Sequence, residues 1–214
     1  MHRPDKWVPG LTRLGRFHIR SLVFVFLLRR PTPTDIDRFH DASRDLPLSY
    51  APVGVLKGPA GDRRFDEQIV SVGHGDADFE RACRALVAWK HFDLGWIAVL
   101  ARPASIDVGT VVAVQIRHLG FWSLNGCRVV YHVEGEGRFG FAYGTLTNHA
   151  ESGEELFEVF MDARTGDVMY RILAVSWPQD PLARLGQPFV RFLQARFRRD
   201  SAAALKRAVR GSNG

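Results

Sequence analysis

The chain has 214 residues, of which 46% are hydrophobic and 24% are charged, and its net charge is +6. These values are ordinary for a soluble globular protein and allow one large domain. The two cysteines, Cys83 and Cys127, show no metal-finger spacing and cannot form a disulfide framework, so they favour a reducing, cytoplasmic location. The positive charge is compatible with an anionic partner, although solubility is its simpler interpretation.

The N-terminal region contains one short apolar run. Residues 1–20 mix Arg, Pro and Gly without a period, so we expect a flexible extension before a single domain over residues 21–209. The run Leu22–Leu28 is too short for a helix that spans a bilayer, which needs roughly 20 residues. The residues Arg29-Arg30-Pro31 behind it offer no signal-peptide cleavage site. Its Val and Phe content predicts a buried strand, and a membrane-surface anchor is the alternative.

Two helices are predicted in the first half of the chain. Thr32 can cap a short helix over Asp35–Ser43, and Pro33 suits the first position of that helix. A strand over Gln68–Gly73 is followed by a second helix, for which Asp76 is the expected cap. The apolar residues of this second helix share one face, and they are Phe79, Ala82, Cys83, Leu86 and Val87.

From residue 96 onward the apolar period changes to two, which is typical of strands. The predicted strands are Trp96–Ala101, Thr110–Leu119, Cys127–Glu134, Phe139–Leu146, Glu155–Met161 and Val168–Trp177. The predicted hairpin turns are Asn125-Gly126, residues 135–137 and residues 165–167. Because the turns are short, the sheet is expected to be antiparallel. Alternation predicts one shared face for Val112, Val114 and Ile116, and likewise for Val129, Tyr131 and Val133.

A long amphipathic helix is predicted after Pro181, and residues 210–214 are expected to form a disordered tail. The apolar stripe of this helix consists of Leu182, Leu185, Phe189, Phe192, Leu193 and Phe197. A sheet with one apolar face needs a cover, and this stripe can provide it. Because its aromatic side chains then face the sheet, they are not available for stacking on bases, and no nucleic-acid partner is expected.

The order of these elements predicts an α+β fold in which a curved antiparallel sheet wraps over a long C-terminal α-helix. This order resembles the helix-grip fold of the superfamily that includes START domains, polyketide cyclases and the birch-pollen allergen (SRPBCC). The resemblance implies a space enclosed between the sheet and the C-terminal helix.

Several motifs resemble a narrower family. In chain order they include LRRPTPTDIDRF, DLPLSYAPVG, FGFAYGTL, NHAESGEELF and RLGQPFVRFLQARFRRDSAAAL. These motifs resemble DUF1990, a family of bacterial and plant proteins with a domain of unknown function, over about Leu27 to Leu205. The resemblance implies no particular reaction, because the family has no established activity.

The candidate catalytic residues surround one predicted turn, where His149, Glu154 and Glu155 lie close in sequence. A histidine beside a carboxylate can act as a general base, so His149 and Glu154 are the candidate pair of a hydrolase or cyclase. The same side chains can instead hold the turn by hydrogen bonds. No third metal ligand is evident, and we expect no cofactor. The GxGxxG pattern at residues 135–140 joins two strands and opens no helix, so it is not a dinucleotide site.

The favoured hypothesis is that the protein binds a small hydrophobic or amphipathic molecule between the sheet and the C-terminal helix. The chain contains 15 Phe and 5 Trp, so we expect an aromatic cavity. The candidate ligand-binding residues are Arg128, Tyr131, Phe139, Phe141, Tyr143, Glu155, Trp177, Phe189 and Leu193, with Arg128 suited to an anionic head group. A third hypothesis is a peripheral membrane-surface protein that uses Leu22–Leu28 and the C-terminal arginines.

Overall fold

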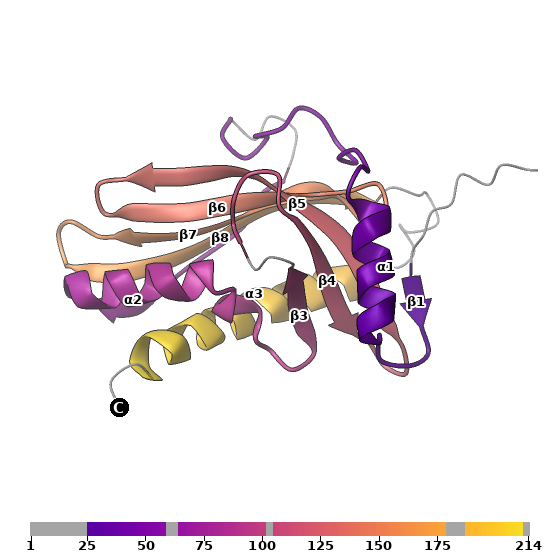
Figure 1. Ribbon diagram of the computed structural model, residues 1–214. Helices are drawn as coiled ribbons and strands as arrows, with labels where there is room; N and C mark the ends of the chain where they lie inside the picture. The colour runs from indigo at the N-terminus through magenta and orange to yellow at the C-terminus, as the bar shows by residue number, and fades with distance from the viewer. Residues whose placement is uncertain (1–24, 59–63, 102–104, 179–186, 212–214) are drawn as a thin grey trace, which may run out of the picture.

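The computed structural model describes residues 25–58, 64–101, 105–178 and 187–211. In these residues eight strands form one antiparallel sheet, in the order β2-β8-β7-β6-β5-β4-β3, with β1 paired to β5 (Figure 1). The strands are β1 (Val25–Leu27), β2 (Asp66–His74), β3 (Ile97–Ala101), β4 (Val111–Arg117), β5 (Trp122–Gly135), β6 (Arg138–Thr145), β7 (Glu151–Met161) and β8 (Asp167–Pro178). The helices are α1 (Pro33–Ser43), α2 (Gly75–Val87) and α3 (Gln187–Arg210), and Lys90–Phe92 forms the short 3-10 helix η1.

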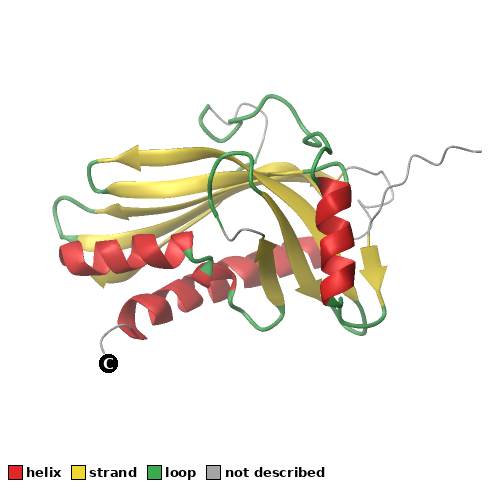
Figure 2. Cartoon of the chain, viewed as in Figure 1, coloured by secondary structure: helices red, strands yellow, loops and turns green. Residues whose placement is uncertain are grey.

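The inner face of the curved sheet is the face covered by α2, η1 and α3 (Figure 2). The strands present large aromatic side chains on this face, and α2 and α3 pack apolar side chains against them. The main members of this inner core are Leu86, Phe92, Phe141, Phe157, Tyr170, Phe197 and Leu205. A helix held in the concavity of an antiparallel sheet is the predicted helix-grip arrangement, which the structure confirms.

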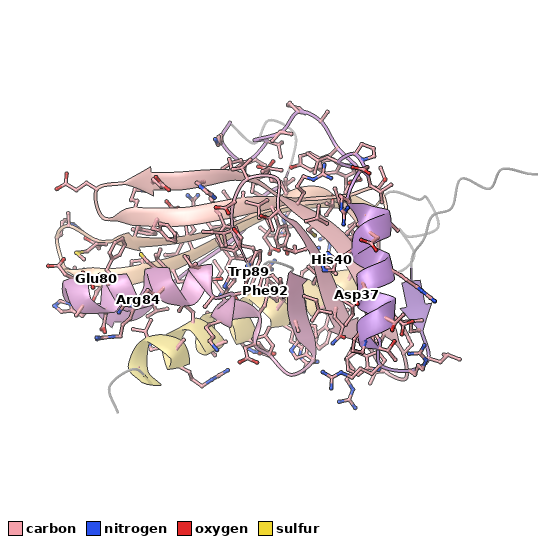
Figure 3. All side chains as sticks on the ribbon, in the orientation of Figure 1. Asp37, His40, Glu80, Arg84, Trp89 and Phe92 are labelled. Atoms are coloured by element: carbon pink, nitrogen blue, oxygen red, sulfur yellow. The ribbon has the colours of Figure 1, made fainter. Side chains whose placement is uncertain are left out.

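The outer face of the sheet carries α1 and the loop at residues 49–58. Phe39 of α1 packs on Ala113 and Leu124, and His40 contacts the carbonyl oxygen of Leu100 at 2.7 Å (Figure 3). The loop adds a second outer cluster, in which Tyr50, Val55 and Leu56 cover Tyr131, Ala142, Leu156, Leu173 and Val175. Burial on both faces therefore fixes the side-chain alternation of the central strands.

Several local predictions are confirmed. Thr32 caps α1 through a capping box with Asp35, since each of the two residues bonds the other's backbone N–H. Part of the apolar run is a strand, because Leu27 pairs with Trp122 of β5. The hairpins at residues 135–137 and 165–167 join β5 to β6 and β7 to β8.

The predicted turn at Asn125-Gly126 is wrong, because both residues lie inside β5. Asn125 pairs with Val114 and Gly126 pairs with Ala113, and the true turn lies at residues 118–121. Gly126 serves a close approach instead of a turn, because a Cβ there would lie 2.2 Å from Oδ1 of Asn148. The glycine therefore leaves room for a buried side chain of the outer face.

The predicted shared face of Val129, Tyr131 and Val133 is also wrong, because β5 is irregular between Val129 and Tyr131. Val129 packs in the inner core, whereas Tyr131 and Val133 belong to the outer cluster. A bulge inserts one extra residue into a strand and so shifts the side-chain alternation beyond it. The period in the sequence continues unbroken across this point and gives no sign of the shift.

The stripe predicted for the C-terminal helix needs one correction. Phe192 is 62% exposed, and the buried face of α3 instead includes Phe197, Ser201, Leu205 and Val209.

The cap predicted for the second helix is also wrong, because the N-cap of α2 is His74, one residue before the helix, and not Asp76. Residues 1–24, 179–186 and 212–214, which include Leu182 and Leu185, lie outside the described residues, as does the side chain of Phe189.

No helix in the described part of the chain is long and apolar enough to cross a membrane. The membrane-surface hypothesis stays a prediction. Leu28 at the end of the apolar run is 92% exposed, whereas two arginines of α3 have partners inside the fold or at its rim. Arg196 lies over the ring of Trp96, and Arg199 pairs with Asp200.

We predict that Gly126→Ala destabilises the fold by about 1–3 kcal/mol, because the new methyl group overpacks a buried site. The displaced Asn148 amide also donates to Ser43 of α1, so the contact between α1 and the sheet weakens. Urea unfolding gives the free energy of unfolding. Gly135→Ala is the matched control in the same strand, because nothing lies within 4 Å of a Cβ at that position. Equal losses in both variants would contradict this role of Gly126.

Candidate functional site

A cavity of about 360 Å³ lies between the inner face of the sheet and α3. Its walls come from the strands β2 to β8, from the N-terminal half of α3 and from the segment that follows α2. Phe92 belongs to that segment, and Figure 3 shows it with Trp89 in the middle of the molecule, next to the end of α2. The apolar walls are Phe92, Trp96, Ile97, Val114, Ile116, Phe121, Leu193 and Phe197. The size and lining are those of a small-molecule site.

Trp96 is held in the cavity wall by α3. Its indole Nε1 donates to Asp200 at 3.1 Å, and the Arg196 guanidinium lies 4.4 Å from the centre of its ring. The hydrogen bond and the cation–π contact fix the position of the ring between β3 and α3. Arg196 of α3 thus helps to build the cavity wall.

Glu155 is the central polar group of the cavity. Its Oε2 accepts a hydrogen bond from the Tyr143 hydroxyl at 2.7 Å. Burial raises the pKa of Glu155 to about 7, although the Tyr143 hydrogen bond and the charge of Arg198 act in the opposite direction. A carboxyl group with this pKa changes its protonation state near neutral pH.

Other polar groups gather near Glu155 at the same end of the cavity. Gln194 of α3 donates to Oε2 of Glu151 at 2.8 Å and to Oγ of Ser176 at 2.9 Å. Burial also raises the pKa of Glu151. His149 Nδ1 accepts from the backbone N–H of Glu151 at 3.0 Å, and burial lowers the pKa of His149 to about 4. The imidazole is therefore neutral at pH 7.

Glu154, the predicted partner of His149, places its carboxylate on the outer face of the sheet. It is 2% exposed and accepts from the hydroxyls of Tyr50 at 2.7 Å and Tyr131 at 2.9 Å. The backbone N–H groups of Gly54 and Leu56 also donate to it, at 2.8 and 3.3 Å. Because adjacent residues of a strand point to opposite faces, Glu154 faces the loop while Glu155 faces the cavity. The two predicted catalytic side chains are therefore not brought together.

The position of Tyr50 depends on a glycine in the neighbouring strand. Gly144 of β6 lies opposite Glu154, and a Cβ at Gly144 would be 2.3 Å from the Tyr50 hydroxyl. The hydroxyl therefore reaches the carboxylate through the space that a side chain would fill.

The structure separates the other predicted site residues into three groups. Tyr143, Glu155, Leu193 and His149 line the cavity. Phe141 is fully buried in the inner core and Phe139 packs against that core, and neither lines the cavity. Three predicted ligand-binding residues lie on the outer side: Tyr131 donates to Glu154, Trp177 packs edge-on against Tyr50, and Arg128 donates to the Arg44 carbonyl oxygen at the end of α1.

Sequence reasoning missed several residues that line the cavity, namely Asp66, Trp96, Glu151, Gln194 and Arg198. Gln194 and Arg198 lie one and five residues after Leu193, so helical spacing alone places them beside the apolar face. Asp66 could be assigned to the cavity only once the sheet order is known, because β2 pairs with β8, which lies about 100 residues later in the sequence.

His91 is a further buried polar residue that the sequence did not single out. It is 0% exposed among Trp89, Phe92, Phe141, Phe157 and Tyr170, and neither ring nitrogen has a hydrogen-bond partner in the described residues. Burial lowers the pKa of His91 to about 3, so the ring is neutral. His91 is not among the cavity-lining residues, and it packs there as one more aromatic ring.

The described residues contain no group of three His, Cys, Asp or Glu side chains that could hold a metal ion. The site is an apolar cavity that is also lined by three carboxyl groups, those of Asp66, Glu151 and Glu155, and by the neutral imidazole of His149.

Comparison with known proteins agrees with the predicted family. The family model for the domain of unknown function DUF1990 matches residues 49–204. The chain belongs to the DUF1990 family. A UPF0548 protein of Dictyostelium discoideum is 32% identical over 211 residues, with 88% of this chain and 97% of that protein covered. A UPF0548 protein of Deinococcus radiodurans is 37% identical over 198 residues, with 86% and 99% covered.

Among solved structures, the protein TTHA0849 of Thermus thermophilus is similar to this DUF1990 chain with a TM-score of 0.50. The similarity covers 71% of this chain and 100% of that one at 11% sequence identity. At this identity the likeness concerns the fold alone. It supports the helix-grip architecture of this DUF1990 protein and leaves its ligand open.

We predict that Glu154→Gln lowers stability and that Glu155→Gln does not. Glu154→Gln is expected to lower the free energy of unfolding by about 3 kcal/mol, because hydrogen bonds to a buried carboxylate are lost and an amide N–H₂ faces other donors. Amide hydrogen exchange at Gly54 and Leu56 should become faster. At pH 8, Glu155→Gln should leave stability unchanged or raise it, because burial disfavours the ionised carboxyl group.

The effect of Glu155→Gln also depends on pH. Between its ordinary value of 4.5 and about 7, the folded protein keeps a proton on Glu155 that the unfolded chain releases. The contribution of this group to stability therefore falls as pH rises through that window. The stability of the variant relative to the natural protein should increase from pH 4.5 to 7 and then level off. A difference that is flat with pH would contradict the raised pKa.

Proposed function

We propose that this protein binds a small, mainly apolar molecule in the cavity between the sheet and α3. The observation that carries the proposal is the cavity itself, which is about 360 Å³ in volume and has apolar walls with polar groups at one end. Polar groups at one end of an apolar site orient a ligand and give it specificity. The ligand is therefore amphipathic, with its polar group next to Glu155.

The inner core supports this proposal, because it is tightly packed elsewhere. Phe141, Phe157 and Tyr170 are almost completely buried and pack between the sheet and α2. Beside its aromatic walls, the cavity is lined by small residues such as Ala174 and Gly153. A space that is kept free of large side chains at one position in a packed interior is suited to a ligand.

A saturable fluorescent probe tests the proposal. N-phenyl-1-naphthylamine, an uncharged probe of apolar sites, should bind with a stoichiometry of one. Leu193→Trp should abolish this binding, because the larger ring fills the cavity. Phe192→Trp is the matched control, since Phe192 is the neighbouring residue and is exposed on α3. Equal binding by both variants, or no saturable binding to the natural protein, would refute the proposal.

The second candidate function is an enzyme, and the position of Glu155 supports it. A buried carboxyl group with a pKa near 7 in a cavity is suited to general acid–base catalysis. Glu155 replaces Glu154 in this hypothesis, with His149 at the same end of the cavity.

Hydrolysis of a panel of aryl esters tests the enzyme hypothesis. Glu155→Gln should lower the turnover by about 100-fold or more while leaving probe binding intact. Rates that are the same in the variant and in the natural protein would eliminate Glu155 as the catalytic group.

A further inference from the structure

The charges of the cavity have the opposite sign to the charge of the whole protein. The chain carries a net charge of +6. Of the residues that line the cavity, however, Asp66, Glu151 and Glu155 direct carboxyl groups toward it, and Arg198 is the one lining arginine or lysine of the described residues. His149 is neutral, because burial lowers its pKa to about 4. An excess of carboxyl groups inside an otherwise basic protein favours a positively charged ligand group.

The carboxyl groups of Asp66 and Glu155 belong to one row across the sheet. Asp66 of β2 pairs with Ala174 of β8, and Ala174 pairs with Glu155 of β7. The next member of the row is Tyr143 of β6, which pairs with Glu155. Residues that are direct partners across strands share a face, so both carboxyl groups stand on the inner face with only a methyl group between them. This leaves a space above Ala174 with an acidic group on each side.

Glu155 has acceptor capacity that the protein does not use. Its Oε2 accepts from Tyr143, whereas Oε1 accepts no hydrogen bond in the part of the chain that the structure describes. Arg198 lies close enough to influence Glu155 electrostatically, yet it forms no ion pair within the described residues. A carboxylate oxygen without a donor in an apolar cavity is costly, and a ligand N–H group would satisfy it.

We propose that the natural ligand is an amphipathic organic amine, whose protonated nitrogen lies between Asp66 and Glu155 and whose apolar body lies along Trp96, Phe197 and Leu193. This inference rests on the proposed ligand-binding function and names the chemical class of the ligand. Aromatic walls add to the attraction, because the faces of aromatic rings favour cations. An anionic head group such as a fatty-acid carboxylate would instead meet like charges.

The inference predicts a pH dependence. The charged and titratable groups that face Glu155 are Tyr143 from β6, Cys127 from β5, Tyr170 from β8, Glu151 from β7, Asp66 from β2 and Arg198 from α3. Burial raises the pKa values of Tyr143, Cys127 and Tyr170, so all three stay neutral near pH 7. The affinity for an amine should therefore rise as pH rises from 6 to 8 and Glu155 ionises, whereas the affinity for a neutral alcohol should stay constant.

Three probes with the same chain and different head groups provide the test. Octylamine, octan-1-ol and octanoate are titrated into the full-length protein by calorimetry at pH 8. Octylamine should bind most tightly and octanoate least. Glu155→Gln should weaken octylamine binding by about tenfold or more while changing octan-1-ol binding little.

Glu67→Gln is the matched control for this test. Glu67 is next to Asp66 in β2 but lies on the outer face, where it pairs with Arg171, so its removal changes the net charge equally without changing the cavity. Octylamine binding that is equal in the two variants would overturn the inference, as would octanoate binding at least as tightly as octylamine. In both cases binding of octan-1-ol and of the naphthylamine probe would leave the proposed function standing. Failure of every probe to bind would refute the proposed function itself.

Discussion

The hydrogen bonds to the buried carboxylate of Glu154 are the interaction on which the rest of the structure depends. Two tyrosine hydroxyls and two backbone N–H groups converge on it, and the donors come from the loop at residues 49–58 and from β5. The loop has no regular secondary structure, so these bonds hold it against the outer face of the sheet. With the outer face covered in this way, the middle strands are buried on both sides.

Burial on both sides explains why this fold can contain a cavity without losing its shape. The outer cluster and the inner core each fix the side-chain alternation of β6, β7 and β8. The strands therefore do not rely on contacts with α3 at the position of the cavity. Adjacent glutamates of β7 consequently have different roles: Glu154 attaches the loop, and Glu155 provides the polar group of the cavity.

Much of the fold could be predicted from the sequence, because the period of two after residue 96 and the helical stripe near the C-terminus reflect burial directly. The positions of the polar groups that line the cavity could not be predicted, because they depend on strand register. Glu154 was predicted to be catalytic, but it lies one residue before Glu155, which faces the cavity. The bulge in β5 turns Tyr131 to the outer face, whereas Arg128, before the bulge, faces outward by regular alternation. Asp66 and Trp96 come together with Glu155 only through pairing of distant segments.

The bulge in β5 divides that strand into two halves with different orientations. Before it, Asn125, Cys127 and Val129 point inward, and after it Tyr131 and Val133 point outward. The bulge thus reverses which face the odd-numbered side chains of β5 occupy. One continuous strand can therefore line the cavity with its first half and supply a donor for Glu154 with its second. In a regular strand of the same sequence, Tyr131 would lie on the same face as Val129. Its ring would then compete with Phe141 for the interior, and Glu154 would lose a donor.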